Sequence, residues 1–356
     1  MLDFRSDTVT RPTPGMRAAM AAAEVGDDVF DEDPTVHALQ ERIADLLGKE
    51  AALYVPSGTM SNQLAVRVHC SPGDELLCEA GCHIQNYEQA AHVQLSGVAA
   101  MPIEGEYGVL EVGQLRGRIR PENEHCVRTR LVCLENTHNR GAGRIQPYEN
   151  VAAICSWARE QGLATHLDGA RLFNAVVATG ISADVWAQQF DTVSICFSKG
   201  LGAPVGSALV GERDAIRAAR RHRKALGGGM RQGGIIAAGA LYALEHHVER
   251  LAEDHIHAQR LGAAIRGIAG LTLTPPDVQT NIVIFEVAPE LGSAAYFCGR
   301  LELQGLRMLA ISPTRVRAVT HLDVTAADVD RACEIVAEVA GSVAAKDANV
   351  PVGQAY

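Results

Sequence analysis

Aromatic side chains are scarce in this chain, and negative charges outnumber positive ones. Aromatic residues make up only 4% of the 356 residues, so we expect a core filled by Ala, Val, Leu and Ile. The formal net charge is −10, which argues against a nucleic-acid partner because such proteins favour a basic surface. No apolar run is long enough to span a membrane, and the N-terminus carries no signal-peptide pattern. These absences favour a cytoplasmic protein.

Paired cysteines and a dinucleotide fingerprint are also missing. The nine cysteines include no C-x-x-C pair, and the closest two, Cys78 and Cys82, have no matching second pair. We therefore expect no metal site, and free thiols in a reducing cytoplasm rather than disulfides. A nicotinamide enzyme would need G-x-G-x-x-G after its first strand. The sequence there is Ser57-Gly58-Thr59-Met60, which argues against that class.

Short apolar runs alternate with helical patterns through much of the chain. This alternation is typical of a largely parallel sheet covered by helices on both faces. The seven runs are 51–55, 75–78, 98–103, 131–134, 164–167, 192–197 and 206–210. We therefore predict an α/β fold whose large domain contains a mostly parallel seven-stranded sheet.

The chain is long enough for two domains. Residues 1–30 are interpreted as an N-terminal arm rich in turn residues. Residues 31–245 form the large domain, and residues 246–343 form a small C-terminal α+β domain. Residues 344–356 are expected to be a flexible tail.

A lysine and an aspartate follow two of the apolar runs. Lys199 stands in Ser198-Lys199-Gly200 after the run 192–197, and Asp168 follows the run 164–167. Ligands of parallel sheets bind at the carboxyl ends of the strands. A lysine there can form a Schiff base with pyridoxal phosphate (PLP), while a carboxylate keeps the pyridine nitrogen protonated. Alone, Asp168 is equally a helix N-cap and Lys199 a surface lysine, but their joint placement favours a PLP site.

The turn Ser57-Gly58-Thr59 fits the same picture. It follows the run 51–55 and precedes a helical stretch, so its small residues and the helix N-terminus can hold a phosphate. Alone, it would be interpreted as an ordinary N-cap turn. Arg171, three residues after Asp168, can reach the cofactor's ring oxygen or a substrate carboxylate.

Longer motifs run in order through residues 2–325. They occupy residues 4–12, 26–29 with 33–36, 57–59, 134–139, 166–175, 198–202, 227–232 and 319–323. With these motifs the chain resembles the low-specificity L-threonine aldolases, within the aspartate-aminotransferase-like PLP-dependent superfamily (fold type I). The resemblance implies a PLP-dependent transferase-like large domain and a cytoplasmic homotetramer built as a dimer of dimers.

The resemblance also implies a set of site residues. Lys199 would carry the cofactor, Asp168 would pair with its pyridine nitrogen, and His83 would stack on its ring. The cofactor-binding residues that it implies are Gly58, Thr59, His83, Asp168, Arg171, Ser198, Lys199 and Arg231, the last reaching a phosphate across a subunit boundary. The substrate carboxylate would be bound by Ser6, Arg171 and Arg317.

The reaction implied is a retro-aldol cleavage through a Lys199 aldimine. L-threonine, L-allo-threonine and related β-hydroxy-α-amino acids would give glycine and an aldehyde. His83 is either the base that takes the β-hydroxyl proton or the group that orients a water for that task. His125 matches the family's second active-site histidine, with an exposed loop histidine as the alternative, and His138 could be structural.

Other outcomes of the same chemistry stay open. They are β-elimination and transaldol transfer onto an acceptor aldehyde, both on a β-substituted amino acid. A non-catalytic protein of the same fold is disfavoured by the intact Lys199, Asp168 and Arg171. The segments 30–32 and 85–91 depart from the usual family pattern. We expect these departures to affect the pocket for the substrate side chain rather than the cofactor chemistry.

Overall fold

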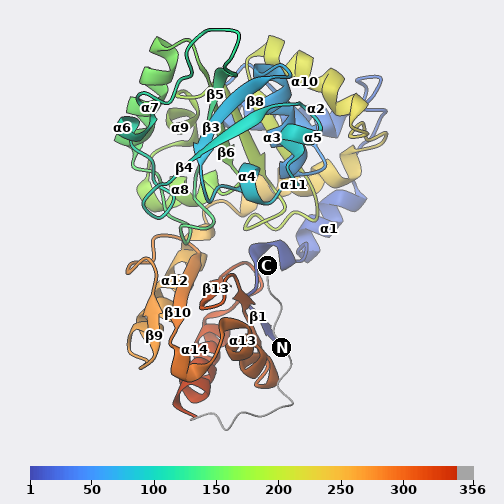
Figure 1. Cartoon of the computed structure of the whole chain (residues 1–356). Coiled ribbons are helices and arrows are strands. Elements are labelled where there is room, and N and C mark those ends of the chain that lie inside the picture. The colour runs from blue at the N-terminus through green and yellow to red at the C-terminus, as the bar shows by residue number, and fades with distance from the viewer. Residues whose placement is uncertain (343–356) are drawn as a thin grey trace.

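The computed structural model describes residues 1–342, which form a larger and a smaller part (Figure 1). The larger part contains a seven-stranded sheet and the smaller a four-stranded sheet. The α/β fold expected from the sequence is therefore confirmed. The expected flexible tail, 344–356, lies outside the described residues. Within residues 1–342, no helix has the length and apolar character needed to cross a membrane.

The large sheet has the strand order β2-β8-β7-β6-β5-β3-β4. Its strands are β2 (Ala51–Val55), β3 (Asp74–Glu79), β4 (Ala99–Ile103), β5 (Arg128–Glu135), β6 (Ala164–Gly169), β7 (Thr192–Cys196) and β8 (Ser207–Gly211). Only β8 runs against its neighbours, and the other pairs are parallel. Every residue of β3, β7 and β8 is buried, as expected for strands covered on both faces.

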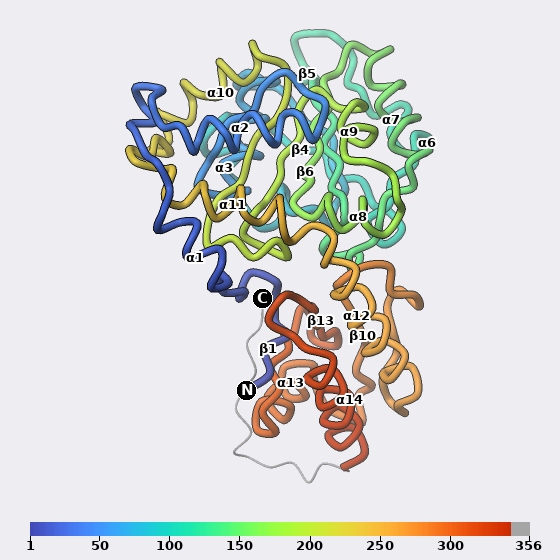
Figure 2. The backbone as a smooth tube through the Cα atoms, turned by 180° about the vertical axis from the view of Figure 1, so that it is seen from behind, coloured from blue at the N-terminus to red at the C-terminus, as the bar shows by residue number. Residues whose placement is uncertain are grey.

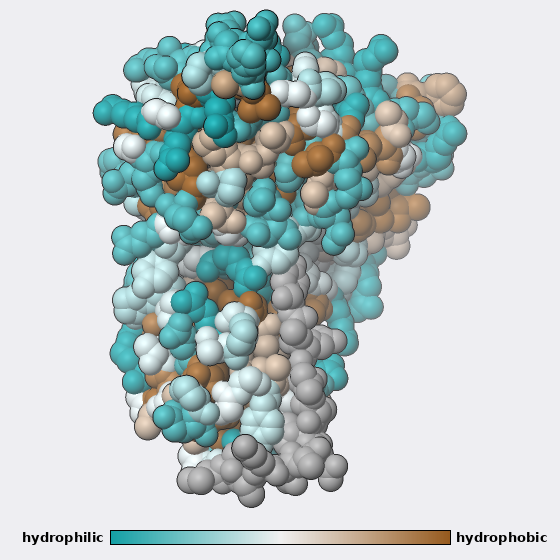
Figure 3. Space-filling model, in the orientation of Figure 1, coloured by the Kyte–Doolittle hydropathy of each residue, from teal (hydrophilic) through white to brown (hydrophobic). Residues whose placement is uncertain are grey.

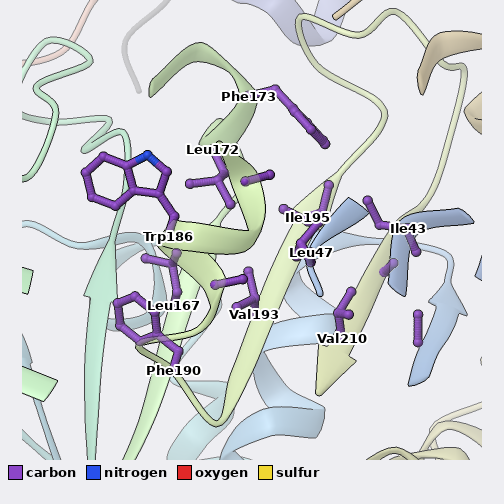
Figure 4. Close-up of a cluster of buried hydrophobic side chains, with 14 of the residues drawn as sticks. Ile43, Leu47, Leu167, Leu172, Phe173, Trp186, Phe190, Val193, Ile195 and Val210 are labelled. Atoms are coloured by element: carbon purple, nitrogen blue, oxygen red, sulfur yellow. The ribbon is translucent and has the colours of Figure 1, made fainter. Parts of the chain in front are cut away.

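Helices cover both faces of this sheet. One face carries α3 (Gly58–His69), α4 (His83–Asn86), α5 (Ala91–Gln94) and α10 (Arg213–Ala225). The other carries α2 (Pro34–Leu46), α6 (Val112–Leu115), α7 (Tyr148–Glu160), α8 (Leu172–Thr179), α9 (Ala183–Ala187) and α11 (Gly234–His246). Figure 2 shows α2 and α11 crossing this second face. The main core lies beneath it, where Leu167 and Val193 from the sheet meet Trp186 and Phe190 (Figure 4).

The small part is an antiparallel sheet with helices on one face. Its strand order is β12-β13-β10-β9. The strands are β9 (Leu271–Leu273), β10 (Ile282–Val287), β12 (Leu309–Ala310) and β13 (Arg315–Val319), and the helices are α12 (Leu251–Arg266), α13 (Ala294–Leu303) and α14 (Ala326–Gly341). A short 3-10 turn, η2 (Pro289–Leu291), precedes α13.

The N-terminal segment joins the two parts. Its first strand, β1 (Leu2–Asp3), pairs in parallel with β11 (Leu306–Arg307), and Phe4 is wholly buried in the small core. The chain then forms a 3-10 turn, η1 (Asp7–Val9), and helix α1 (Pro14–Ala21), which packs on α11 of the large part. This path carries residues 5–9 through the junction between the two sheets.

Candidate active site

A cavity of about 280 Å³ lies at this junction. The N-terminal segment contributes Ser6 to its wall, and the small part contributes Arg317. The large part contributes side chains at or beyond the carboxyl ends of its strands, among them His83, Glu135, Asp168, Arg171 and Lys199. The structure therefore brings together most of the site residues expected from the sequence.

Asp168 is buried at the end of β6. Its Oδ1 accepts a hydrogen bond from the Ala170 amide (3.1 Å), and its Oδ2 accepts one from Asn62 Nδ2 (2.8 Å). Burial acts to raise the pKa of Asp168, but the charges of His83 and Lys199 and the Asn62 bond hold that pKa below its ordinary value. The carboxylate therefore stays charged and suits a protonated ring nitrogen.

Helix α3 begins beside the end of β7. Its N-cap is Ser57, whose side chain accepts from the Met60 amide, so the amides of Gly58 and Thr59 are left for another acceptor. A Cβ on residue 58 would lie 2.6 Å from Cys196 Sγ, so only glycine allows this approach. Free amides at a helix N-terminus fit a phosphate group.

Arg171 is held by a partner that the sequence did not indicate. Its Nε and Nη2 both donate to the Asp7 carboxylate, each over 2.7 Å, and both residues are buried. Burial acts to raise the pKa of Asp7, yet the guanidinium of Arg171 and the charges of Lys199 and Arg317 hold that pKa well below its usual range. The paired guanidinium keeps its remaining N–H groups for a ligand.

Arg317 reaches the cavity from β13. Its Nη1 donates to Asn139 Oδ1 (2.9 Å) and its Nη2 to the Arg5 carbonyl (3.1 Å). Ser6 lies on the same cavity wall, where its hydroxyl accepts from Thr8 as the N-cap of η1. With Arg171, these residues form a basic and polar end of the cavity that suits a carboxylate.

His83 begins α4 and is fixed at two atoms. Its amide donates to Glu135 Oε2 (2.7 Å), and its Nδ1 lies 2.8 Å from Glu88 Oε1. Burial acts to lower the pKa of His83, but the hydrogen bond to Glu88 and the charge of Asp168 raise it above the ordinary value of 6.5. With Nδ1 occupied, Nε2 is the nitrogen left to exchange a proton with a ligand.

His125 does not reach the cavity of its own chain. It precedes β5, whereas Glu135 ends that strand in register with Asp168, so His125 lies toward the opposite end of the sheet. Its side chain is 85% exposed. Within the single chain the structure does not bring His125 to the cavity, and the residue occupies the exposed loop position that was its alternative. His138, in contrast, is buried, and its Nε2 lies 2.8 Å from Glu79 Oε2.

Four residues expected to bind the cofactor do not line the cavity. Ser198 adjoins Lys199 but does not line the cavity, and Gly58 and Thr59 lie at the start of α3. Arg231 is exposed and pairs with Asp27 (3.0 Å).

Comparisons with known proteins give a consistent picture. The family model described as "Beta-eliminating lyase" matches residues 3–288. The chain is 44% identical over 326 residues to the low specificity L-threonine aldolase of Escherichia coli strain K12, covering 91% of this chain and 95% of that protein.

Solved structures of low identity share the fold. A threonine aldolase from Leishmania major aligns with a TM-score of 0.82 at 21% identity, over 96% of this chain and 100% of that one. A serine palmitoyltransferase solved with PLP aligns with a TM-score of 0.74 at 17% identity, over 95% of this chain and 86% of that one.

Proposed function

Because the chain belongs to the beta-eliminating lyase family and, within it, to the low-specificity L-threonine aldolases, we propose that it cleaves L-threonine and L-allo-threonine to glycine and acetaldehyde. Related β-hydroxy-α-amino acids would give glycine and the corresponding aldehyde. The observation that carries this proposal is the shared cavity of Lys199, Asp168, Arg171 and Arg317. It combines a cofactor-binding amine and carboxylate with two guanidiniums for an amino-acid carboxylate.

The cofactor is PLP, as in the family. Lys199 would hold it through the side-chain amine, Asp168 through the ring nitrogen, and Gly58 and Thr59 through the phosphate. His83 would lie against the ring. Bound there, the cofactor supplies an electron sink for the bond that breaks in the substrate.

The substrate carboxylate would be bound by Ser6, Arg171 and Arg317. Asp7 keeps the Arg171 guanidinium in one orientation, which lowers the entropic cost of aligning the substrate. A carboxylate fixed at this end of the cavity places the rest of the amino acid toward Lys199 and His83.

His83 would remove the β-hydroxyl proton, directly or through an oriented water. Its Nδ1 is bonded to Glu88, so Nε2 is the basic nitrogen. Since the base must be neutral, turnover should rise with pH through the raised pKa of His83. The proton taken from the hydroxyl is then available on His83 for return to the product.

The proposed assembly is a homotetramer built from dimers. The apolar residues Phe30 and Ile235 are 71% and 49% exposed. A hydrogen bond from the Gly234 amide to Asp33 Oδ2 (2.8 Å) joins the segments that contain them. Figure 3 shows apolar residues grouped near this edge of the large part. Arg231 is exposed close by and would reach a neighbouring subunit's phosphate. His125 would have a catalytic role only in a neighbouring subunit's site.

The division into segments 1–30, 31–245 and 246–343 is part of the proposal, as is a location in the cytoplasm. All nine cysteines, which lie within residues 1–342, are free, and that fits a reducing compartment.

The test is a product balance. Purified protein with PLP is given L-threonine and, separately, L-allo-threonine, and glycine, acetaldehyde, ammonia and keto acid are followed with time. Equal amounts of glycine and acetaldehyde support the aldolase. Keto acid with an equal amount of ammonia would instead support β-elimination, the outcome that the name of the family model favours. The Lys199→Ala variant is the control, because it measures any product formation that does not depend on the cofactor-binding lysine.

A further inference from the structure

One nitrogen of Asn62 contacts two carboxylates at the site, those of Asp168 and Glu88. It lies on α3 and is buried. Its Nδ2 donates to Asp168 Oδ2 and to Glu88 Oε1, each over 2.8 Å. An amide nitrogen carries two hydrogens, so each carboxylate receives one. Asp168 serves the cofactor ring and Glu88 serves His83, so this amide stands between two functional groups.

The other end of the amide fixes its orientation. Asn62 Oδ1 lies 3.1 Å from His166 Nε2, and His166 Nδ1 lies 2.9 Å from Thr192 Oγ1. Burial lowers the pKa of His166 to about 4, so the ring is neutral and has a single N–H at working pH. Because Asn62 Oδ1 can only accept, that hydrogen belongs on Nε2, and Nδ1 accepts from the Thr192 hydroxyl.

The series of hydrogen bonds continues to His69, and every donor in it can point toward Asn62. His69, at the end of α3, lies with Nε2 3.0 Å from Thr192 Oγ1. With His69 donating, each group in the series His69, Thr192, His166 and Asn62 donates toward the two carboxylates. A flipped Asn62 amide would instead turn its oxygen toward both carboxylates and lose both bonds.

Glu88 has a side chain with no solvent exposure and is surrounded by donors. Asn62 and His83 Nδ1 share Oε1, and Gln63 Nε2 donates to Oε2 over 2.6 Å. His83, Glu88 and Asp168 also come close enough together to hold a metal ion. The Asn62 Nδ2 donor already satisfies one oxygen of each carboxylate there, which makes the centre of this cluster a hydrogen-bond site rather than a cation site.

We propose that Asn62 and Glu88 are positioning residues of this site: Glu88 orients His83, and Asn62 ties that pair to the carboxylate that binds the cofactor ring. The inference rests on the proposed PLP-dependent cleavage and deepens it. Asn62 then supports two events at once, keeping the ring nitrogen protonated through Asp168 and keeping His83 Nε2 free to act as the base.

The test follows protonation at two places, His83 and the ring nitrogen that pairs with Asp168, and few titratable groups act on either. Glu88, Asp168 and Lys199 act on the pKa of His83, and His83, Lys199 and the titratable but neutral His166 act on that of Asp168. Substituting Asn62 or its neighbour Gln63 changes none of these charges. Effects of the two substitutions therefore arise from lost hydrogen bonds.

The chain offers a matched pair for the test. Asn62→Leu and Gln63→Leu each remove one buried amide of α3 that donates to Glu88, but only Asn62 also donates to Asp168. A third variant, Glu88→Gln, keeps the shape and removes the charge beside His83. Holoenzyme of each is prepared with PLP labelled with ¹⁵N in the ring, so that the nitrogen signal reports protonation apart from turnover.

We expect Asn62→Leu to move the ring-nitrogen signal toward the unprotonated value, because Asp168 without its donor binds the shared proton more tightly. Loss of a hydrogen bond to a charged group should lower the pH midpoint of this signal by roughly one unit or more. Gln63→Leu should leave the signal as in the parent protein. Glu88→Gln should also leave it, while moving the acid limb of kcat/KM to lower pH.

An unchanged ring-nitrogen signal in Asn62→Leu would overturn the proposal, and so would an equal change in Gln63→Leu. An unmoved acid limb in Glu88→Gln would remove the role of Glu88. If Asn62→Leu does not fold, Asn62→Ala gives the same test, because alanine suits a helix. A parent protein that binds no PLP or cleaves no substrate would count against the proposed function, whereas a working parent with unresponsive variants counts against this inference alone.

Discussion

Asp7→Asn is the substitution whose effect on the free energy of unfolding follows most directly from the structure. Asp7 is wholly buried, receives two bonds of 2.7 Å from Arg171, and accepts a third from Asn281 Nδ2 (3.3 Å). Asparagine keeps the shape but removes the carboxylate that is hydrogen-bonded to the buried guanidinium. Removing one partner of a buried ion pair costs about 3–5 kcal/mol, so we expect a loss of that order in the free energy of unfolding by urea at pH 7.

The stability difference between the parent protein and Asp7→Asn should also depend on pH. The pKa of Asp7 is depressed in the folded protein, so its stabilisation is present above the unfolded value of 3.8 and is lost as the pH falls through the folded value. The difference between parent and Asp7→Asn should therefore be largest near neutral pH and shrink in acid. Asp3→Asn is the matched control in the same segment, because Asp3 pairs with the partly exposed Arg5 (2.6 Å) and should cost less than about 1 kcal/mol. Equal losses for the two variants at pH 7 would refute the reasoning.

Three further predictions concern the cavity and the phosphate turn at the start of α3. Lys199→Ala should abolish cleavage and the visible absorbance of bound PLP, and near-parent turnover would exclude Lys199 as the cofactor-binding amine. His83→Ala should lower kcat by about a hundred-fold or more with little loss of PLP occupancy, and the acid limb of the parent's kcat/KM should have its midpoint above pH 6.5; an acid limb below that value would move the base elsewhere. Gly58→Ala should weaken PLP binding by about ten-fold, because its Cβ would meet Cys196 Sγ at 2.6 Å, whereas Gly113→Ala, with open space, should not.

The sequence predicts the residues that follow strands. Asp168 and Lys199 stand at the ends of apolar runs, and the rule that ligands bind at the carboxyl ends of parallel strands places them together. The same rule also predicts that His125 does not reach the cavity of its own chain. It precedes its strand, and a residue before a parallel strand lies at the opposite end of the sheet from one that follows it.

The supporting partners were not predictable from local pattern. Asp7 lies 164 residues from Arg171, and Asn62 lies 106 residues from Asp168. Glu88 lies only five residues from His83, but a bend after α4 turns its side chain inward, and no periodic pattern marks that bend. Such contacts depend on how distant elements pack, which composition and spacing do not encode.

The central claim is that Lys199 holds the cofactor, and the chain makes a direct test simple because it contains four lysines. The holoenzyme is reduced with borohydride and digested. The mass of each lysine-containing peptide is then measured by mass spectrometry. We predict the mass of the reduced cofactor on the peptide with Lys199 and on no other. The same mass on Lys49 or Lys224, with Lys199 unmodified, would contradict the account.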